Sequence, residues 1–345
     1  MNDAGVAKVG VIGAGSWGTT VALLAAHNAS VTLWARRSEL AATIRDRHEN
    51  PAYLPGVRLP SALDASDSLV EVCDGADVVV VGVPSHGFRD VLSDAAASIR
   101  PDVPIVSLSK GVEQGTNARM TEVIADVLAD HRRDRIGVLT GPNLAAEVAA
   151  GQPAASVVAI ADADAASRLQ SLFMTPMFRV YTNPDVVGCE IAGALKNVVA
   201  IAVGIAHGLG YGDNAKAALI TRGLAELARL GVTMGGDPLT FAGLAGMGDL
   251  IATCSSPQSR NRTVGVELGQ GRSLDEIVAS MRMVAEGVKS TAAVLELAAE
   301  HGIELPVAAF VGRVLYSGAQ PADLVPELML RKARPELDGL RRDPA

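Results

Sequence analysis

Residues 8–26 constrain the fold most, because a short apolar run, regularly placed glycines and a helical pattern follow one another directly. Residues 8–12, KVGVI, form a β-branched run with the length of a buried strand. In such a strand–turn–helix unit Gly13 makes the tight turn, Gly15 lets the backbone approach a pyrophosphate, and Gly18 lets the helix pack on the strand. The helix N-terminus then faces the phosphates. This context predicts a Rossmann-type α/β domain that binds a dinucleotide.

Further apolar runs predict the other strands of one sheet. They lie at residues 30–34, 77–83, 104–108, 136–140, 155–161 and 178–182. The continuous run at 77–83 is typical of a parallel strand that is covered on both faces. A chain of 345 residues also exceeds the usual size of a single core. We therefore expect an α/β Rossmann-type dinucleotide-binding domain over residues 1–187.

After residue 187 the periodicity is helical, which predicts an all-α C-terminal domain over 188–335 and a frayed tail at 336–345. The expected helices lie at about 190–206, 214–230, 238–242, 248–253, 260–270, 273–280, 289–301, 306–316 and 321–329. A helical domain with this much Ala and Leu could supply the interface of a homodimer.

Composition narrows the classes of partner. The net charge of -8 gives no reason to expect nucleic acid or an anionic membrane, so an anionic ligand needs a local basic pocket. The six histidines fall in no metal-ligand spacing, and no metal is expected. The three cysteines lie far apart, which fits a reducing compartment. No uninterrupted apolar run reaches the ~18 residues of a membrane span. We expect a cytoplasmic protein without such a span.

The end of the strand at 30–34 bears on which cofactor binds. An NAD-preferring site usually has an acidic residue here, whereas this chain continues Ala35-Arg36-Arg37. Two arginines suit a 2'-phosphate, so NADPH is favoured over NADH. Exposed arginines at the start of a loop are also common, and that alternative stays open.

The most unusual lysine of the chain is Lys196, which lies near the middle of the apolar stretch 188–208. A helix that is apolar on nearly all sides belongs in a core. A buried ammonium must reach water along its stem, meet a carboxylate, or lose its proton easily. The third case describes a proton donor. The alternative is a lysine that reaches the surface at a domain seam.

Polar residues elsewhere could address a ligand. Lys110 follows the strand at 104–108, where open α/β sheets bind ligands, although a loop lysine is usually solvated. If a helix starts at Gly248 or Asp249, then Asp249 and Thr253 share one face and could address one ligand or one lysine. For Asp249 alone, an N-cap is the more common role. The stretch 259–262, SRNR, precedes a helix and could bind an anion, with a surface basic patch as the alternative. Together with the dinucleotide fold, these groups indicate hydride transfer to a small phosphorylated carbonyl compound.

The chain resembles the bacterial NAD(P)-dependent glycerol-3-phosphate dehydrogenases over essentially its whole length. The resemblance rests on the motifs GAGSWGT, SLSKG, TGPNLAAE, GALKNVVAIA, GYGDNAKAALITRGLAE, GLAGMGDLIATC, SRNR and VAEGVKS. It implies interconversion of dihydroxyacetone phosphate and sn-glycerol 3-phosphate, which feeds glycerophospholipid synthesis.

Roles carry over by motif position. The resemblance implies that Lys196 is the catalytic acid/base; we expect Asn197, Asp249 and Thr253 to orient the reacting groups. Substrate contacts would fall on Lys110, Gly141, Asn143, Lys196, Asp249, Ser259, Arg260 and Asn261. Cofactor contacts would fall on Ser16, Trp17, Arg36, Arg37, Lys110, Ala145, Arg260, Val284 and Glu286, besides the turn glycines Gly13, Gly15 and Gly18. Asn143 departs from the serine or threonine common in the family, and we expect altered affinity more than an altered reaction.

A useful general acid has a pKa nearer 7 to 8 than the ~10.4 of free lysine. Burial and a neighbouring cation such as Arg260 would lower the pKa of Lys196, whereas an ionised Asp249 close by would oppose that. Two rival interpretations remain. A β-hydroxyacid dehydrogenase of the 6-phosphogluconate type is less favoured because of the SRNR and GMGDL stretches. A non-catalytic NADP sensor would tolerate loss of Lys196, Asp249 and Arg260, all of which are present.

Overall fold

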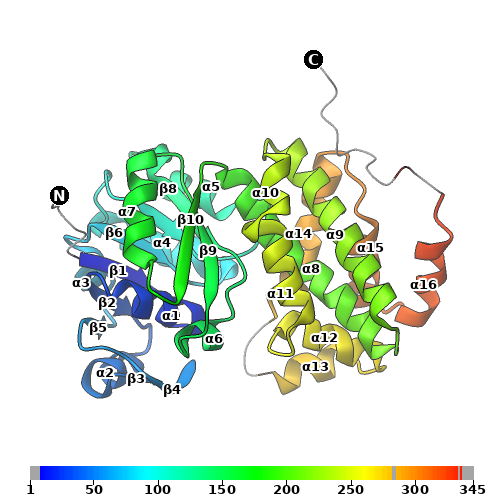
Figure 1. Cartoon of the computed structure of the whole chain (residues 1–345), viewed down its shortest axis with the longest axis horizontal. Coiled ribbons are helices and arrows are strands. Elements are labelled where there is room, and N and C mark those ends of the chain that lie inside the picture. The colour runs from blue at the N-terminus through cyan, green and yellow to red at the C-terminus, as the bar shows by residue number, and fades with distance from the viewer. Residues whose placement is uncertain (1–7, 282–284, 333–334, 336–345) are drawn as a thin grey trace. The chain divides into compact units, whose positions relative to one another are not determined.

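The computed structural model describes residues 8–281, 285–332 and 335 (Figure 1). These residues divide into two compact units. The sheet unit consists of residues 8–110 and 118–186, and the helical unit consists of residues 111–117 and the described residues from 187 onward. The expected fold class, a Rossmann-type α/β domain followed by an all-α domain, is confirmed.

Residues 111–117 belong to the helical unit, although the sequence-based division places them in the first domain. The physical reason is local packing. Val112 is buried in the apolar core of the helical unit. Asn117 Nδ2 donates a hydrogen bond of 2.9 Å to Glu300 Oε1, and Gln114 Nε2 donates one of 3.2 Å to the carbonyl of Lys289.

Among the described residues the main sheet has eight strands in the order β10-β9-β8-β7-β6-β1-β2-β5. Neighbouring strands are parallel except for β8 and β9, which are antiparallel. The chain turns from one side of β1 to the other between β5 and β6, so the strand order reverses at β1 and β6. The strands are β1 Lys8–Ile12, β2 Ser30–Trp34, β5 Leu63–Ser66, β6 Val78–Val81, β7 Ile105–Ser107, β8 Ile136–Thr140, β9 Ala154–Ala159 and β10 Phe178–Asn183.

Helices cover both faces of this sheet. On β6, Val78 and Val80 join one core cluster while Val79 and Val81 join the other, as the two-residue period of a strand requires. Helices α1, α2 and α7 contribute to the first cluster, and α3, α4 and α5 to the second. The helices of the sheet unit are α1 Ser16–Ala25, α2 Ser38–Arg47, α3 Leu69–Cys73, α4 Phe88–Ala95, α5 Met120–Val127, α6 Ala145–Ala149 and α7 Ala163–Phe173; β3 Glu49–Asn50 and β4 Leu54–Arg58 form a separate hairpin.

The helical unit is organised around α8, Val186–Gly208. Of the helices that the structure describes, α8 alone has the length and composition to cross a membrane, yet 83% of its most apolar window is buried inside the fold. It is thus the core helix of this unit. The other elements are α9 Asp213–Thr233, α10 Pro238–Ala242, a π-helical turn Leu244–Gly248, α11 Asp249–Ser255, α12 Arg260–Gly269, α13 Leu274–Ser280, α14 Glu286–Glu300, α15 Pro306–Tyr316 and α16 Pro321–Met329.

Glycines bring α8 and α12 into backbone contact. A Cβ on Gly204 would lie 2.2 Å from the carbonyl oxygen of Arg262, and one on Gly265 would lie 2.1 Å from that of Ile201. Such approaches exclude any larger residue. The close crossing fixes the position of the first turn of α12 against the lysine-bearing part of α8.

Candidate active site

The predicted dinucleotide turn links β1 to α1. Gly13 has a φ of 121°, and a Cβ there would lie 2.6 Å from the carbonyl oxygen of Gly82. A Cβ on Gly18 would lie 2.0 Å from the carbonyl oxygen of Gly13. At Gly15, by contrast, a Cβ would meet no atom within 4 Å. The turn is therefore closed on the protein side and open beside Gly15, at the helix end whose amide groups have no helical partner.

This open space fits the pyrophosphate of a dinucleotide. The first-turn amides of α1 and its dipole favour an anion there. Trp17, also predicted to contact the cofactor, is in this turn, and its buried Nε1 has no hydrogen-bond partner among the described residues. Ala145 begins α6, and its carbonyl accepts a hydrogen bond of 3.3 Å from Thr20 Oγ1 of α1.

The sequence did not predict three residues that support the turn, namely Thr19, Asn50 and Tyr53. Buried Asn50 donates through Nδ2 to the carbonyl of Ala14 at 2.9 Å and to Thr19 Oγ1 at 2.8 Å. Ser16 Oγ donates to the carbonyl of Tyr53 at 2.6 Å. A buried asparagine in a short polar stretch has no sequence signature, because its partners lie more than thirty residues away.

The two arginines expected at a 2'-phosphate follow β2 directly. Arg36 and Arg37 are both exposed. The Arg37 guanidinium carbon lies 5.7 Å from the centre of the Tyr53 ring, a distance typical of a cation–π contact. The carboxyl end of β2 therefore carries two positive charges and no acidic side chain at the positions 35–37.

Lys110, Gly141 and Asn143 lie beyond the ends of β7 and β8. Lys110 Nζ donates to the carbonyl of Gly141 at 3.3 Å. The Gly141 φ of 137° is the conformation that favours glycine, and a Cβ there would lie 3.2 Å from Ser156 Cα. The Gly141 backbone conformation thus presents its carbonyl to the Lys110 ammonium.

The orientation of the Asn143 amide follows from its neighbours. Asn143 Nδ2 lies 2.9 Å from Ser156 Oγ, which lies 2.8 Å from the carbonyl oxygen of Thr140. The serine has one proton, and it must donate that proton to the carbonyl and accept from Asn143. Asn143 Oδ1 remains as a buried acceptor without a hydrogen-bond partner among the described residues. Sequence reasoning missed Ser156.

In the helical unit Lys196 meets a carboxylate. Its Nζ lies 2.6 Å from Asp249 Oδ1 and 2.8 Å from Thr253 Oγ1. The Thr253 hydroxyl donates to the carbonyl of Asp249 at 2.7 Å, so its oxygen accepts from the lysine. Lys196 is 6% exposed and Asp249 is 2% exposed. Asp249 is the first residue of α11 and follows the N-cap Gly248, so it is not itself the N-cap.

The electrostatic balance at Lys196 has two opposing parts. Burial disfavours the ammonium, whereas a carboxylate 2.6 Å away favours it strongly. The nearby Cys254 thiol adds no charge, because burial raises its pKa to about 12. An ammonium that is paired, buried and hydrogen-bonded can hold a proton ready for transfer.

Asn197, the next residue of α8, belongs to a second buried network. Asn261 Nδ2 donates to Asn197 Oδ1 at 2.9 Å, and Asn261 Oδ1 accepts from the Gly287 amide at 2.9 Å. The Asn261 amide therefore ties α12 to both α8 and α14.

The remaining predicted residues lie near the start of α12 and α14. Ser259 caps α12 by accepting from the Arg262 amide at 3.3 Å, and Arg260 in the first turn is exposed. Glu286 is the first residue of α14. Val284, and the expected tail at 336–345, lie outside the described residues.

Comparisons with known proteins indicate the same family for both units. The N-terminal family model of NAD-dependent glycerol-3-phosphate dehydrogenase matches residues 8–166, and the C-terminal model matches residues 185–326. A glycerol-3-phosphate dehydrogenase [NAD(P)+] 2 of Sphingopyxis alaskensis is 60% identical over 87% of this chain and 90% of its own length. A glycerol-3-phosphate dehydrogenase [NAD(P)+] of Streptomyces griseus is 54% identical over 95% of this chain and 98% of its own.

A solved structure shows the same likeness. The crystal structure of glycerol-3-phosphate dehydrogenase from Coxiella burnetii matches with a TM-score of 0.89 at 37% identity, over 94% of this chain and 99% of that chain. The chain is therefore an oxidoreductase that belongs to the NAD-dependent glycerol-3-phosphate dehydrogenase family.

Proposed function

We propose that this enzyme reduces dihydroxyacetone phosphate to sn-glycerol 3-phosphate, reversibly, with Lys196 as the proton donor. The observation that carries the proposal is the buried contact of Lys196 Nζ with Asp249 and Thr253. A lysine is almost never fully buried unless its ammonium is paired. Here two acceptors hold the ammonium in one geometry. NAD(P)H, held at the turn of Gly13, Gly15 and Gly18, would supply the hydride to the carbonyl carbon.

The chain's own residues then handle the proton. As the carbonyl oxygen becomes negative, a proton leaves Lys196 Nζ and forms the new O–H bond, and the amine regains a proton from water. The Asp249 carboxylate keeps the ammonium charged beforehand, so the proton is released only when a strong base, the forming alkoxide, is present. Thr253 fixes the direction of Nζ through its hydroxyl oxygen.

Arg260 and the first turn of α12 are the proposed holders of the substrate phosphate. Ser259 caps this ten-residue helix, and Arg260 is exposed beside its N-terminal amides. A helix N-terminus and a guanidinium both favour phosphate. Binding energy from this remote group would align the carbonyl for reaction. Asn143 Oδ1, an acceptor without a partner among the described residues, suits a substrate hydroxyl.

Preference for NADPH is the proposed consequence of Arg36 and Arg37, whose charges complement a 2'-phosphate. The family resemblance further supports a role in supplying glycerol 3-phosphate for phospholipid synthesis, in the cytoplasm, as a homodimer.

The test follows NADPH oxidation by the purified protein with dihydroxyacetone phosphate and, in parallel, with unphosphorylated dihydroxyacetone and with NADH. We expect rapid turnover only with the phosphorylated ketone, and a lower KM for NADPH than for NADH. Absence of turnover with either ketone, in a protein that binds NADPH, would overturn the proposed reaction.

A further inference from the structure

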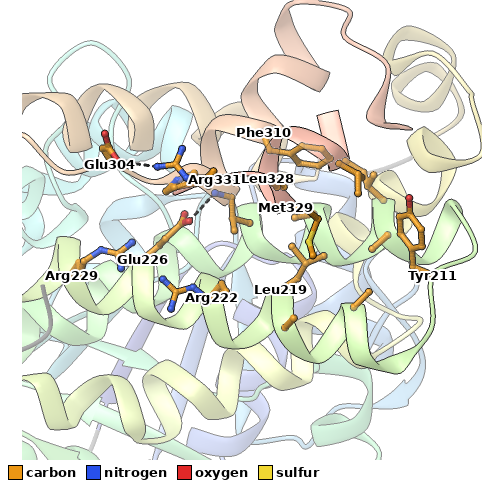
Figure 2. Close-up of a pocket in the computed structure, with 18 of the residues that line it drawn as sticks. Tyr211, Leu219, Arg222, Glu226, Arg229, Glu304, Phe310, Leu328, Met329 and Arg331 are labelled. Carbon is orange, nitrogen blue, oxygen red and sulfur yellow. Dashed lines mark hydrogen bonds and ion pairs between the residues drawn. The ribbon is translucent and has the colours of Figure 1, made fainter. Parts of the chain in front are cut away.

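An open cavity of about 870 Å³ lies on the helical unit, and several of its lining residues, such as Met329 and Tyr211, are exposed. Helices α8, α9, α15 and α16 and the segment at 302–304 form its wall (Figure 2). Its volume lies in the range of cavities that bind small organic molecules, about 300–1,000 Å³. None of the described residues assigned to the reaction lines it.

One end of this cavity is apolar. Leu219, Phe310, Leu328 and Met329 gather there with Tyr211 (Figure 2). Small side chains such as Ala218 on α9 leave room between the helices. An apolar hollow of this kind is costly to leave in contact with water, and an aliphatic chain would fill it favourably.

The other end is charged. Arg222, Glu226 and Arg229 lie one and two turns apart on α9 and point toward the same end, where Arg331 pairs with Glu304 at 2.9 Å (Figure 2). This separation of charged and apolar ends is that of an amphipathic ligand.

Among the residues that the structure describes, those lining the charged end carry more positive than negative charge. The lining arginines Arg222, Arg229 and Arg331 outnumber the lining carboxylates of Glu226 and Glu304, in a chain whose net charge is -8. Both oxygens of Glu226 already accept backbone amides of α15, at 2.7 Å and 3.3 Å. Burial also raises the pKa of Glu226 to about 7, which reduces its negative charge near neutrality. The local field therefore favours an anion.

We propose that this cavity binds an alkyl chain that carries a single anionic head group. The head group contacts Arg222 and Arg229, and the chain lies along the apolar side chains of α15 and α16. A carboxylate and a phosphate monoester share this chemistry.

The test is calorimetric titration with decanoate and decyl phosphate below their micelle concentrations, with decanol and acetate as the neutral and short-chain comparisons. We expect one site per chain, binding of decanoate or decyl phosphate at least about tenfold tighter than decanol, and no binding of acetate. Binding is measured without turnover, so the result does not depend on the proposed reaction.

Matched variants locate the site. Ala217 and Ala218 are both exposed, but only Ala218 lines the cavity, so Ala218→Trp places an indole in it and Ala217→Trp does not. Arg222→Gln removes one charge of the cavity, and Arg58→Gln removes an exposed charge of the sheet unit. We expect about tenfold weaker binding in Ala218→Trp and Arg222→Gln and unchanged binding in the two controls.

Equal binding in all four variants, equal binding of decanol and decanoate, or no binding at all would overturn the proposal. If no binding is observed, light scattering tests whether a second copy of the chain covers the cavity. If Ala218→Trp, but not Ala217→Trp, lowers the oligomeric mass, a second copy of the chain covers the cavity and the proposed ligand is wrong.

Discussion

Glu226 provides a quantitative test of how the helical unit is held together. It is 3% exposed, and burial raises its pKa from 4.5 to about 7, against the opposing effects of the Val307 and Ala308 amides and of Arg222 and Arg229. Between these values the folded state holds a proton that the unfolded chain has lost. The free energy of unfolding therefore falls as the pH rises from about 4.5 to about 7, and the stabilisation present below pH 4.5 is lost.

The magnitude follows from the two pKa values. Their difference, 7 minus 4.5, corresponds to roughly 3 kcal/mol at 1.36 kcal/mol for each pKa unit. The substitution Glu226→Gln removes the titration but keeps an oxygen that can accept one α15 amide. We expect the stability of the variant relative to the wild type to increase by roughly 2 to 3 kcal/mol between pH 5 and pH 8.

Urea unfolding followed by far-ultraviolet circular dichroism measures this change, because the helical unit contributes much of the helix signal. Glu296→Gln, at an exposed position of α14, is the control and is expected to follow the wild type at both pH values. If Glu226→Gln and the wild type keep a constant stability difference from pH 5 to pH 8, the buried carboxyl of Glu226 does not titrate in this range.

Two further predictions concern packing and cofactor choice. Gly204→Ala places a methyl group 2.2 Å from a backbone carbonyl of α12, so we expect the free energy of unfolding to fall by roughly 1 to 3 kcal/mol. Gly212→Ala, at the N-cap of α9, faces open space and should lower the melting temperature less. Equal melting temperatures of the two variants would refute the close helix crossing. Arg36→Asp combined with Arg37→Ser should weaken NADPH binding more than NADH binding in a fluorescence titration, and an equal effect on both cofactors would refute the 2'-phosphate assignment.

The parts of the fold that the sequence predicts are those with local signals. The predicted strand, turn and helix are present: Gly13 has a positive φ, a Cβ on Gly18 would meet the Gly13 carbonyl, and Gly15 faces open space. These features could be predicted because strand, turn and helix are adjacent in the chain. The apolar stretch around Lys196 is the predicted core helix. The pattern could not predict that β9 runs antiparallel to β8, since strand direction depends on connections and not on hydrophobicity. The edge strand at 63–66, LDAS, has too little apolar character to be recognised.

In the candidate site, too, local spacing could be predicted and long-range contacts could not. The four-residue spacing of Asp249 and Thr253 predicts that they share a face, but only the fold shows that Lys196, 53 residues earlier, lies between their oxygens. Asn261 stays a predicted substrate contact, and only the fold shows that its side chain also donates to Asn197 Oδ1 and accepts from the Gly287 amide. Such long-range partners leave no periodic trace in a single sequence.

The most direct test of the central claim compares Lys196→Ala with Lys216→Ala in dihydroxyacetone phosphate reduction. Lys216 is a suitable control because its amine pairs with Asp213 on α9, 2.6 Å away. With Lys196 as the proton donor, Lys196→Ala should lower kcat by about 10²- to 10⁴-fold while NADPH binding, measured by fluorescence, stays nearly unchanged, and Lys216→Ala should keep full activity. Substantial reductase activity in Lys196→Ala would contradict the proposed mechanism.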